Sequence, residues 1–65
     1  MFSYDPLWKK LIDYKMNKTQ LIEQCGLSRA TVAKMGKNQY IDMSSLDKIC
    51  AFFNCDLCEI VTFIK

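Results

Sequence analysis

Apolar residues recur along the chain mainly at intervals of three and four positions, which is the spacing of one face of an α-helix. Strict alternation of apolar and polar residues, the pattern of a strand, is sparse. Start and stop signals divide the helical pattern into five segments. We therefore predict five short helices: about 6–15, about 18–25, about 29–35, one after Asp42 and one after Asp56.

The start and stop signals are residues with specific backbone preferences. A polar side chain ahead of a helix accepts a hydrogen bond from the first turn, and a Gln or Glu three residues later can bond back. The expected caps are Asp5, Asn17 with Gln20, Ser28, Asp42, and Asp56 with Glu59. Gly and Asn adopt most easily the left-handed conformation that ends a helix. The expected stops are Gly26, Gly36 and Asn54.

These elements predict a compact all-α fold of five helices in one domain spanning 1–65. A short strand at the N-terminus is an optional addition, because residues 2–4 alternate in polarity and residues 62–64 have a similar character. We nevertheless assign the second of these segments to the fifth helix. The apolar side chains expected to line that helix are Leu57, Ile60, Val61 and Ile64.

Composition excludes several classes of protein. The chain has 65 residues, of which 51% are hydrophobic and 25% charged, as in ordinary soluble domains. No apolar run approaches the roughly 20 residues of a membrane helix, and the N-terminus lacks the pattern of a signal peptide. So small a chain leaves little room for a catalytic cleft, and it contains no His. We therefore expect a cytoplasmic protein that is not an enzyme and has no cofactor and no small-molecule ligand.

The four cysteines raise the question of a metal site. They are Cys25, Cys50, Cys55 and Cys58. A zinc site would need all four thiolates, because no His is available. Three of the four fall where a core residue is expected, and a reduced Cys packs as a small hydrophobic residue. We favour packing over a metal site or a disulfide.

Charge is distributed unevenly along the chain. Residues 1–38 carry seven basic and three acidic side chains, a net charge of +4, whereas residues 39–65 carry two basic and four acidic ones, a net charge of −2. A positive half suits a polyanionic partner. Taken alone, the same distribution is equally compatible with a random scatter of surface charge.

The most informative segment runs from Thr19 to Met35. It contains a short helix, a turn that begins with Gly26, the apolar turn residue Leu27, the hydroxyl cap Ser28 and a second short helix. Gly26 permits the sharp reversal, and Leu27 fills the space between the two helices. Such an arrangement pushes the second helix outward, where its first residues can reach the edges of bases.

With these residues the chain resembles the lambda repressor and Cro-like helix-turn-helix domains, also called the XRE family. The resemblance covers roughly 7–61, and its most specific part is the stretch from Asn17 to Met35. It implies a compact five-helix DNA-binding domain. It further implies a sequence-specific transcriptional regulator, most often a repressor, whose third helix enters the major groove of double-stranded DNA.

The resemblance also assigns DNA contacts to individual positions. They are Lys18, Ser28, Arg29, Ala30, Thr31, Lys34, Lys37 and Asn38. Arg29 can bond a guanine in bidentate fashion, and Ala30 and Thr31 can touch a thymine methyl group. The base-reading positions of the family often carry Gln, which this chain lacks there, so the operator cannot be inferred by analogy. For Thr31, a role as a simple filler of the helix face remains open.

Exposed aromatic residues near both chain ends suggest self-association. Domains of this type bind paired half-sites about one DNA turn apart, so we expect a homodimer through the C-terminal helix and the end segments. The alternative is that these aromatic residues pack on their own helices. An alternative function is a protein-interaction module, such as an antitoxin or an anti-repressor component, which the acidic second half of the chain favours.

Overall fold

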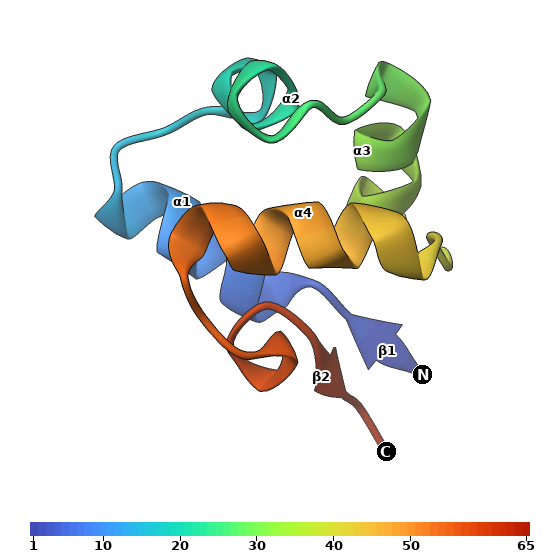
Figure 1. The fold of residues 1–65 in the computed structure, drawn as a ribbon. Coiled ribbons are helices and arrows are strands. Elements are labelled where there is room, and N and C mark those ends of the chain that lie inside the picture. The colour runs from blue at the N-terminus through green and yellow to red at the C-terminus, as the bar shows by residue number, and fades with distance from the viewer.

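The computed structural model describes all residues from Met1 to Lys65 and contains four α-helices (Figure 1). The helices are α1 (Asp5–Asp13), α2 (Lys18–Cys25), α3 (Arg29–Gly36) and α4 (Met43–Phe53). A single 3-10 turn, η1 (Leu57–Glu59), follows α4. Two strands, β1 (Phe2–Ser3) and β2 (Thr62–Phe63), pair in antiparallel fashion and bring the chain ends together. The helical bundle predicted from the sequence is therefore confirmed in its first four helices.

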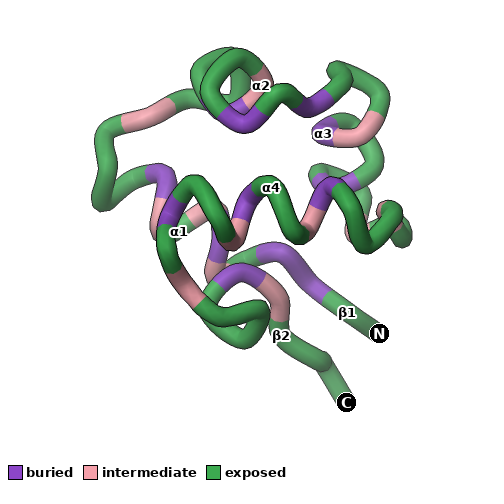
Figure 2. Tube along the Cα trace, in the orientation of Figure 1, coloured by how far each residue is buried: buried purple, intermediate pink, exposed green.

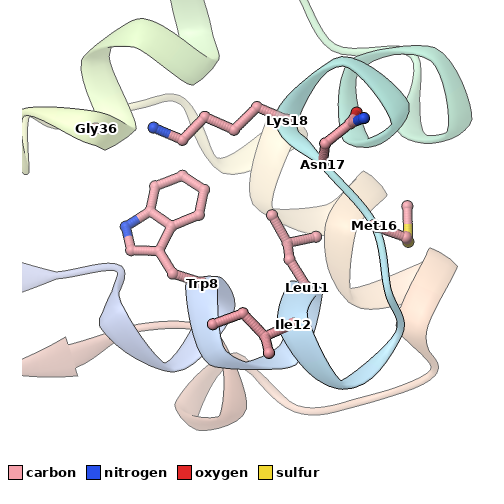
Figure 3. Close-up of a pocket in the computed structure, with 7 residues that line it drawn as sticks. All are labelled: Trp8, Leu11, Ile12, Met16, Asn17, Lys18 and Gly36. Atoms are coloured by element: carbon pink, nitrogen blue, oxygen red, sulfur yellow. The ribbon is translucent and has the colours of Figure 1, made fainter.

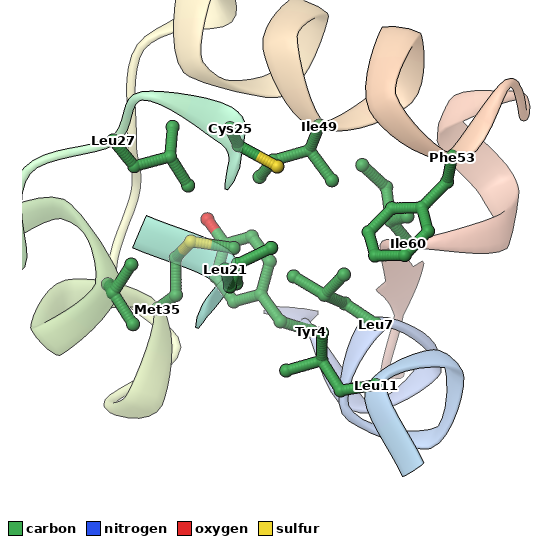
Figure 4. Packing of buried hydrophobic residues seen from close by; sticks show 11 residues of the cluster. Tyr4, Leu7, Leu11, Leu21, Cys25, Leu27, Met35, Ile49, Phe53 and Ile60 are labelled. Atoms are coloured by element: carbon green, nitrogen blue, oxygen red, sulfur yellow. The ribbon is translucent and has the colours of Figure 1, made fainter. Parts of the chain in front are cut away.

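One hydrophobic cluster lies at the centre of these elements. In Figure 1, α2 lies on one side of α4 and the two strands lie on the other. Eleven buried side chains from the helices and their connections form the cluster (Figures 2 and 4). Among them, Leu7, Leu21, Met35, Ile49 and Ile60 are 0% exposed. Burying one such aliphatic side chain contributes about 1.5–3 kcal/mol, and each of the four helices contributes two side chains to the cluster.

The predicted fifth helix is wrong beyond its first turn. Its start is correct, because Asp56 and Glu59 form the expected capping box. Ile60 is fully buried, but Thr62 and Phe63 then pair with Ser3 and Phe2 instead of continuing a helix. β-branched and aromatic residues suit a strand, and the rings of Phe2 and Phe63 pack edge to face with centroids 5.3 Å apart. The long-range partner thus overrides the local helical spacing.

The helices end at residues with a left-handed backbone conformation, but these are not always the predicted residues. Gly26 (φ +69°) and Asn54 (φ +51°) end α2 and α4 as expected. Helix α1 ends earlier than predicted, because Lys15 adopts φ +56° and the N–H of Met16 bonds the carbonyl of Leu11. This 6→1 bond is the one that closes a Schellman motif.

The end of α3 also differs from the prediction. Gly36 is still helical, and the left-handed residue is Asn38 (φ +55°). The N–H of Asn38 bonds the carbonyl of Met35, and the N–H of Gln39 bonds the carbonyl of Lys34. Both bonds of a Schellman motif are therefore present. Gly36 therefore does not stop the helix.

The helix starts follow the predicted caps except at α1. Asn17 and Gln20 form a reciprocal capping box, and Asp42 accepts hydrogen bonds from Ser44 and Ser45. These bonds lower the pKa of Asp42 to about 2 from its ordinary value of 3.8. Asp5 is the first residue of α1 rather than its cap, and its N–H donates to the hydroxyl of buried Ser3.

Three of the cysteines pack as core residues. Cys25 is buried, and Cys50 and Cys55 are half-buried against the hydrophobic cluster, whereas Cys58 is exposed. Burial raises the pKa of the Cys25 and Cys50 thiols. Both thiols are therefore protonated at neutral pH, as packed cysteines are.

None of the four helices has the length and apolar character required to span a bilayer.

Gly26 provides a test of the turn between α2 and α3. A Cβ atom at this position meets no atom within 4 Å, so the cost of Gly26→Ala comes from the backbone alone. The left-handed conformation costs a residue with a Cβ about 1–2 kcal/mol. We expect Gly26→Ala to lower the free energy of unfolding in urea by about 1 kcal/mol. Gly26→Asn is the matched control and should lose less, because Asn tolerates this conformation.

Candidate nucleic-acid interface

Helices α2 and α3 are joined by a tight turn that is fixed on three sides. The N–H of Leu27 bonds the carbonyl of Ile22 at 3.0 Å, and the Leu27 side chain is buried. From α4, the ammonium group of Lys48 lies 3.5 Å from the carbonyl oxygen of Gly26. Val32 and Met35 then anchor α3 through its inner face. These contacts turn the other face of α3 toward solvent.

The start of α3 is closed by two hydroxyl groups. The Ser28 hydroxyl accepts a hydrogen bond from the N–H of Thr31 at 3.1 Å, and the two side-chain oxygens lie 2.9 Å apart. Ser28 is exposed and Thr31 is half-buried. The hydroxyl of Thr31 is thus engaged in the cap. The N–H groups of Arg29 and Ala30, in the first turn, have no intrahelical carbonyl to bond.

The outer face of α3 carries Arg29, Ala30, Ala33 and Lys34, all of which are exposed. Because the alanines are small, no side chain protrudes from the helix surface between Arg29 and Lys34. Low surface relief lets a helix approach a groove closely, while the long side chains reach its edges. Three residues of the expected site, Arg29, Ala30 and Lys34, therefore lie together on one accessible surface.

The loop after α3 is held by the N-terminal segment. Tyr4 is 4% exposed, and its hydroxyl donates to the carbonyl of Gln39 at 2.8 Å. The N–H of Tyr4 approaches Oδ1 of Asn38 at 3.4 Å. Burial raises the pKa of Tyr4 and so keeps this hydroxyl a donor. Asn38 is half-buried and serves first to shape the loop, whereas Lys37 remains exposed.

Lys18, at the start of α2, lies in a small open pocket (Figure 3). Its ammonium nitrogen is 4.8 Å from the centroid of the Trp8 ring on α1. Sequence patterns did not reveal this contact, because Trp8 and Lys18 lie on different helices and Trp8 follows the apolar periodicity of α1. A half-buried Trp is nevertheless a residue that usually finds a polar or cationic partner.

The cations of this surface are not neutralised within the protein. The one ion pair of the chain joins Lys10 to Glu59 at 3.8 Å. None of the other eight Lys and Arg side chains has a carboxylate within 4.0 Å. On this surface they are Lys18, Arg29, Lys34 and Lys37. Their positive charge is therefore available to a polyanion, and its interaction would weaken as salt screens it.

Ser28→Ala tests whether this surface depends on the cap. We expect the substitution to lower the free energy of unfolding by about 1 kcal/mol, because the N–H of Thr31 loses its acceptor. Ser28→Asn is the matched control, since Asn is an equally good cap. The measurement is urea denaturation followed by circular dichroism. Equal stability of the Ala variant and the wild type would show that the cap contributes nothing.

Two comparisons with known proteins found a similarity to this chain. The family model of the Cro/C1-type helix-turn-helix DNA-binding domain matches residues 6–65. Among solved structures, the chain is similar to the crystal structure of the transcriptional regulator VanUg, with a TM-score of 0.89 and 44% sequence identity. That similarity covers 94% of this chain and 81% of the other. A search of curated proteins found no match.

Proposed function

The chain belongs to the family of Cro/C1-type helix-turn-helix DNA-binding domains, and from this we propose that it is a sequence-specific transcriptional regulator. In this proposal α3 enters the major groove of double-stranded DNA. The observation that carries it is the exposed face of α3, on which Arg29 and Lys34 flank small residues and lack an acidic partner. We assign the chain no catalytic step.

The residues of this face have distinct proposed roles. Arg29, in the first turn of α3, reads a guanine through two parallel hydrogen bonds, a contact that discriminates between bases by about 1–3 kcal/mol. Ala30 offers its methyl group to a thymine. The hydroxyl of Thr31 is engaged with Ser28, so Thr31 also offers only its methyl group. Lys34, one turn later, reaches either a guanine or a phosphate.

Phosphate contacts surround the base-reading face in this proposal. Lys18 and Lys37 lie at the start of α2 and just after α3, and both are exposed. Ser28 is exposed at the start of α3 and keeps its hydroxyl oxygen near the free first-turn N–H groups. The amide nitrogen of Asn38 is left as a donor, because only its oxygen faces Tyr4. Such contacts fix the register of a protein on DNA.

We propose repression as the effect of binding. A bound domain excludes other proteins from the DNA that it covers, whereas activation needs a further surface that recruits the transcription machinery. The helix-turn-helix itself provides only the surface that covers the DNA.

Two substitutions separate base reading from phosphate binding. Arg29→Ala should reduce the preference between the selected site and its variants at one base pair by about 1–3 kcal/mol. Lys37→Ala should weaken binding to all sequences alike and lower the slope of log affinity against log salt by about 1. The measurement is fluorescence anisotropy of labelled duplexes first selected from a random pool.

Lys65→Ala is the matched control for charge. Lys65 follows β2, which lies across α4 from α2 (Figure 1). Its removal changes the net charge as Lys37→Ala does, but should leave the affinity nearly unchanged. The proposed function is wrong if the wild-type protein selects no duplex sequence at low salt, and the role of Arg29 is wrong if its Ala variant keeps the full base preference.

We also propose a homodimer, through a surface different from the predicted C-terminal helix. The end segments, which were expected to take part in the dimer, pair with each other within the chain. What remains exposed beside them is apolar, including Tyr40 (79% exposed) and Met43 (71% exposed) next to Phe2 and Leu57. A regulator that binds two half-sites needs such a self-complementary surface.

Charged substitutions at this apolar surface test the dimer. Tyr40→Glu and Met43→Glu should leave the fold intact, because both side chains are exposed, but should shift the sedimentation of the protein toward the monomer. Ile12→Glu on α1 is the control, since Ile12 is 74% exposed and lies outside this surface. A wild-type protein that sediments as a monomer at high micromolar concentration, with and without duplex DNA, contradicts the proposal.

A further inference from the structure

Lys18 lines a pocket in which its ammonium group lies over an aromatic ring. Its walls come from α1, from the start of α2 and from the last turn of α3, and its volume is about 270 Å³ (Figure 3). The indole ring of Trp8 forms one side, and the Lys18 ammonium nitrogen lies 4.8 Å from its centroid. Figure 3 shows the Lys18 side chain extended across the ring toward Gly36.

Gly36 lines the same pocket, next to the Lys18 ammonium group. A Cβ atom at Gly36 would lie 3.4 Å from the Lys18 ammonium nitrogen, and Gly36 is helical rather than left-handed. The absence of a side chain is therefore not required by the backbone. It leaves open the space beside the ammonium group. The end of a helix also carries partial negative charge, which favours a cation there.

The chemistry of this contact differs from that of an ion pair. A carboxylate would hold Lys18 and neutralise it, whereas an aromatic ring attracts the ammonium group through its quadrupole and leaves the net charge in place. No carboxylate lies within 4.0 Å of Lys18, and its side chain makes no hydrogen bond within the protein. Lys18 thus has an aromatic neighbour and no anionic partner.

We propose that Trp8 is a positioning residue for DNA binding, which holds the Lys18 ammonium group in place for one phosphate of the DNA backbone. This inference rests on the proposed function. A free Lys side chain loses rotamer entropy when it is fixed on a ligand. A side chain that is already held before binding avoids part of this cost, so affinity rises without a new contact to the DNA.

A thermodynamic cycle tests the coupling between the two residues. Trp8→Leu should weaken binding of a selected duplex by about two- to fivefold, the range that corresponds to an exposed cation–π contact. Trp8→Phe keeps an aromatic face and should restore part of the loss. In the Lys18→Gln background, Trp8→Leu should cause no further loss, because the cation that it positions is absent. Affinity is measured by fluorescence anisotropy at a temperature at which all variants are folded.

Substitutions at Gly36 test the same pocket without altering Trp8. Gly36→Ala places its Cβ in ordinary contact with Lys18 and should bind DNA as the wild type does. Gly36→Val adds two γ-carbons on a stiff side chain, which occupy the space beside the ammonium group. It should weaken binding by about as much as Trp8→Leu and have no effect in the Lys18→Gln background. This pair remains informative even if Trp8→Leu does not fold.

Trp8 is the only tryptophan of the chain, so its fluorescence reports on this pocket alone. Saturating duplex DNA should protect Trp8 from quenching by iodide in the wild type and protect it less in Lys18→Gln. The inference is overturned if Trp8→Leu weakens binding equally in both backgrounds, since Trp8 would then act only through the fold, or if DNA leaves the quenching unchanged. Absence of binding by the wild type would instead overturn the proposed function.

Discussion

Eleven buried side chains hold together four helices and a strand pair, and this small core constrains the rest of the structure. Ile49 of α4 is fully buried in the same cluster as Leu21 of α2 and Met35 of α3 (Figure 4). Loss of any one of them would remove a large part of the attachment of its helix. The angle between α2 and α3, on which the exposed face of α3 depends, is therefore set by very few contacts.

Hydrogen bonds of polar groups fix the helix ends and the loop after α3, which so small a core does not fix by itself. A capped start and a left-handed end fix the length of a helix to within a residue, because they pair the N–H and carbonyl groups left over at its ends. Tyr4 acts similarly over a longer range, since it joins the first strand to the loop after α3 through its backbone and its hydroxyl. The surface that faces solvent at α3 thus rests on hydrogen bonds as much as on apolar contacts.

Local signals in the sequence predicted most of this scaffold, and long-range contacts account for what they missed. The caps at Asn17, Ser28 and Asp42 act within four residues, so they could be read directly from the sequence. The strand at 62–63 could not, because its partner is at the other end of the chain. The left-handed conformation of Lys15 was missed because Lys has no intrinsic preference for it.

The same distinction applies to the candidate interface. The cations at the start of α2, on α3 and in the following loop were found by their positions in a linear motif, whereas the contact of Lys18 with Trp8 depends on how α1 packs against α2 and α3. Lys10, by contrast, has a carboxylate partner, Glu59, at 3.8 Å. A surface that binds a polyanion keeps more of its positive charge when its cations are not paired with carboxylates, and an aromatic face attracts a cation without neutralising it.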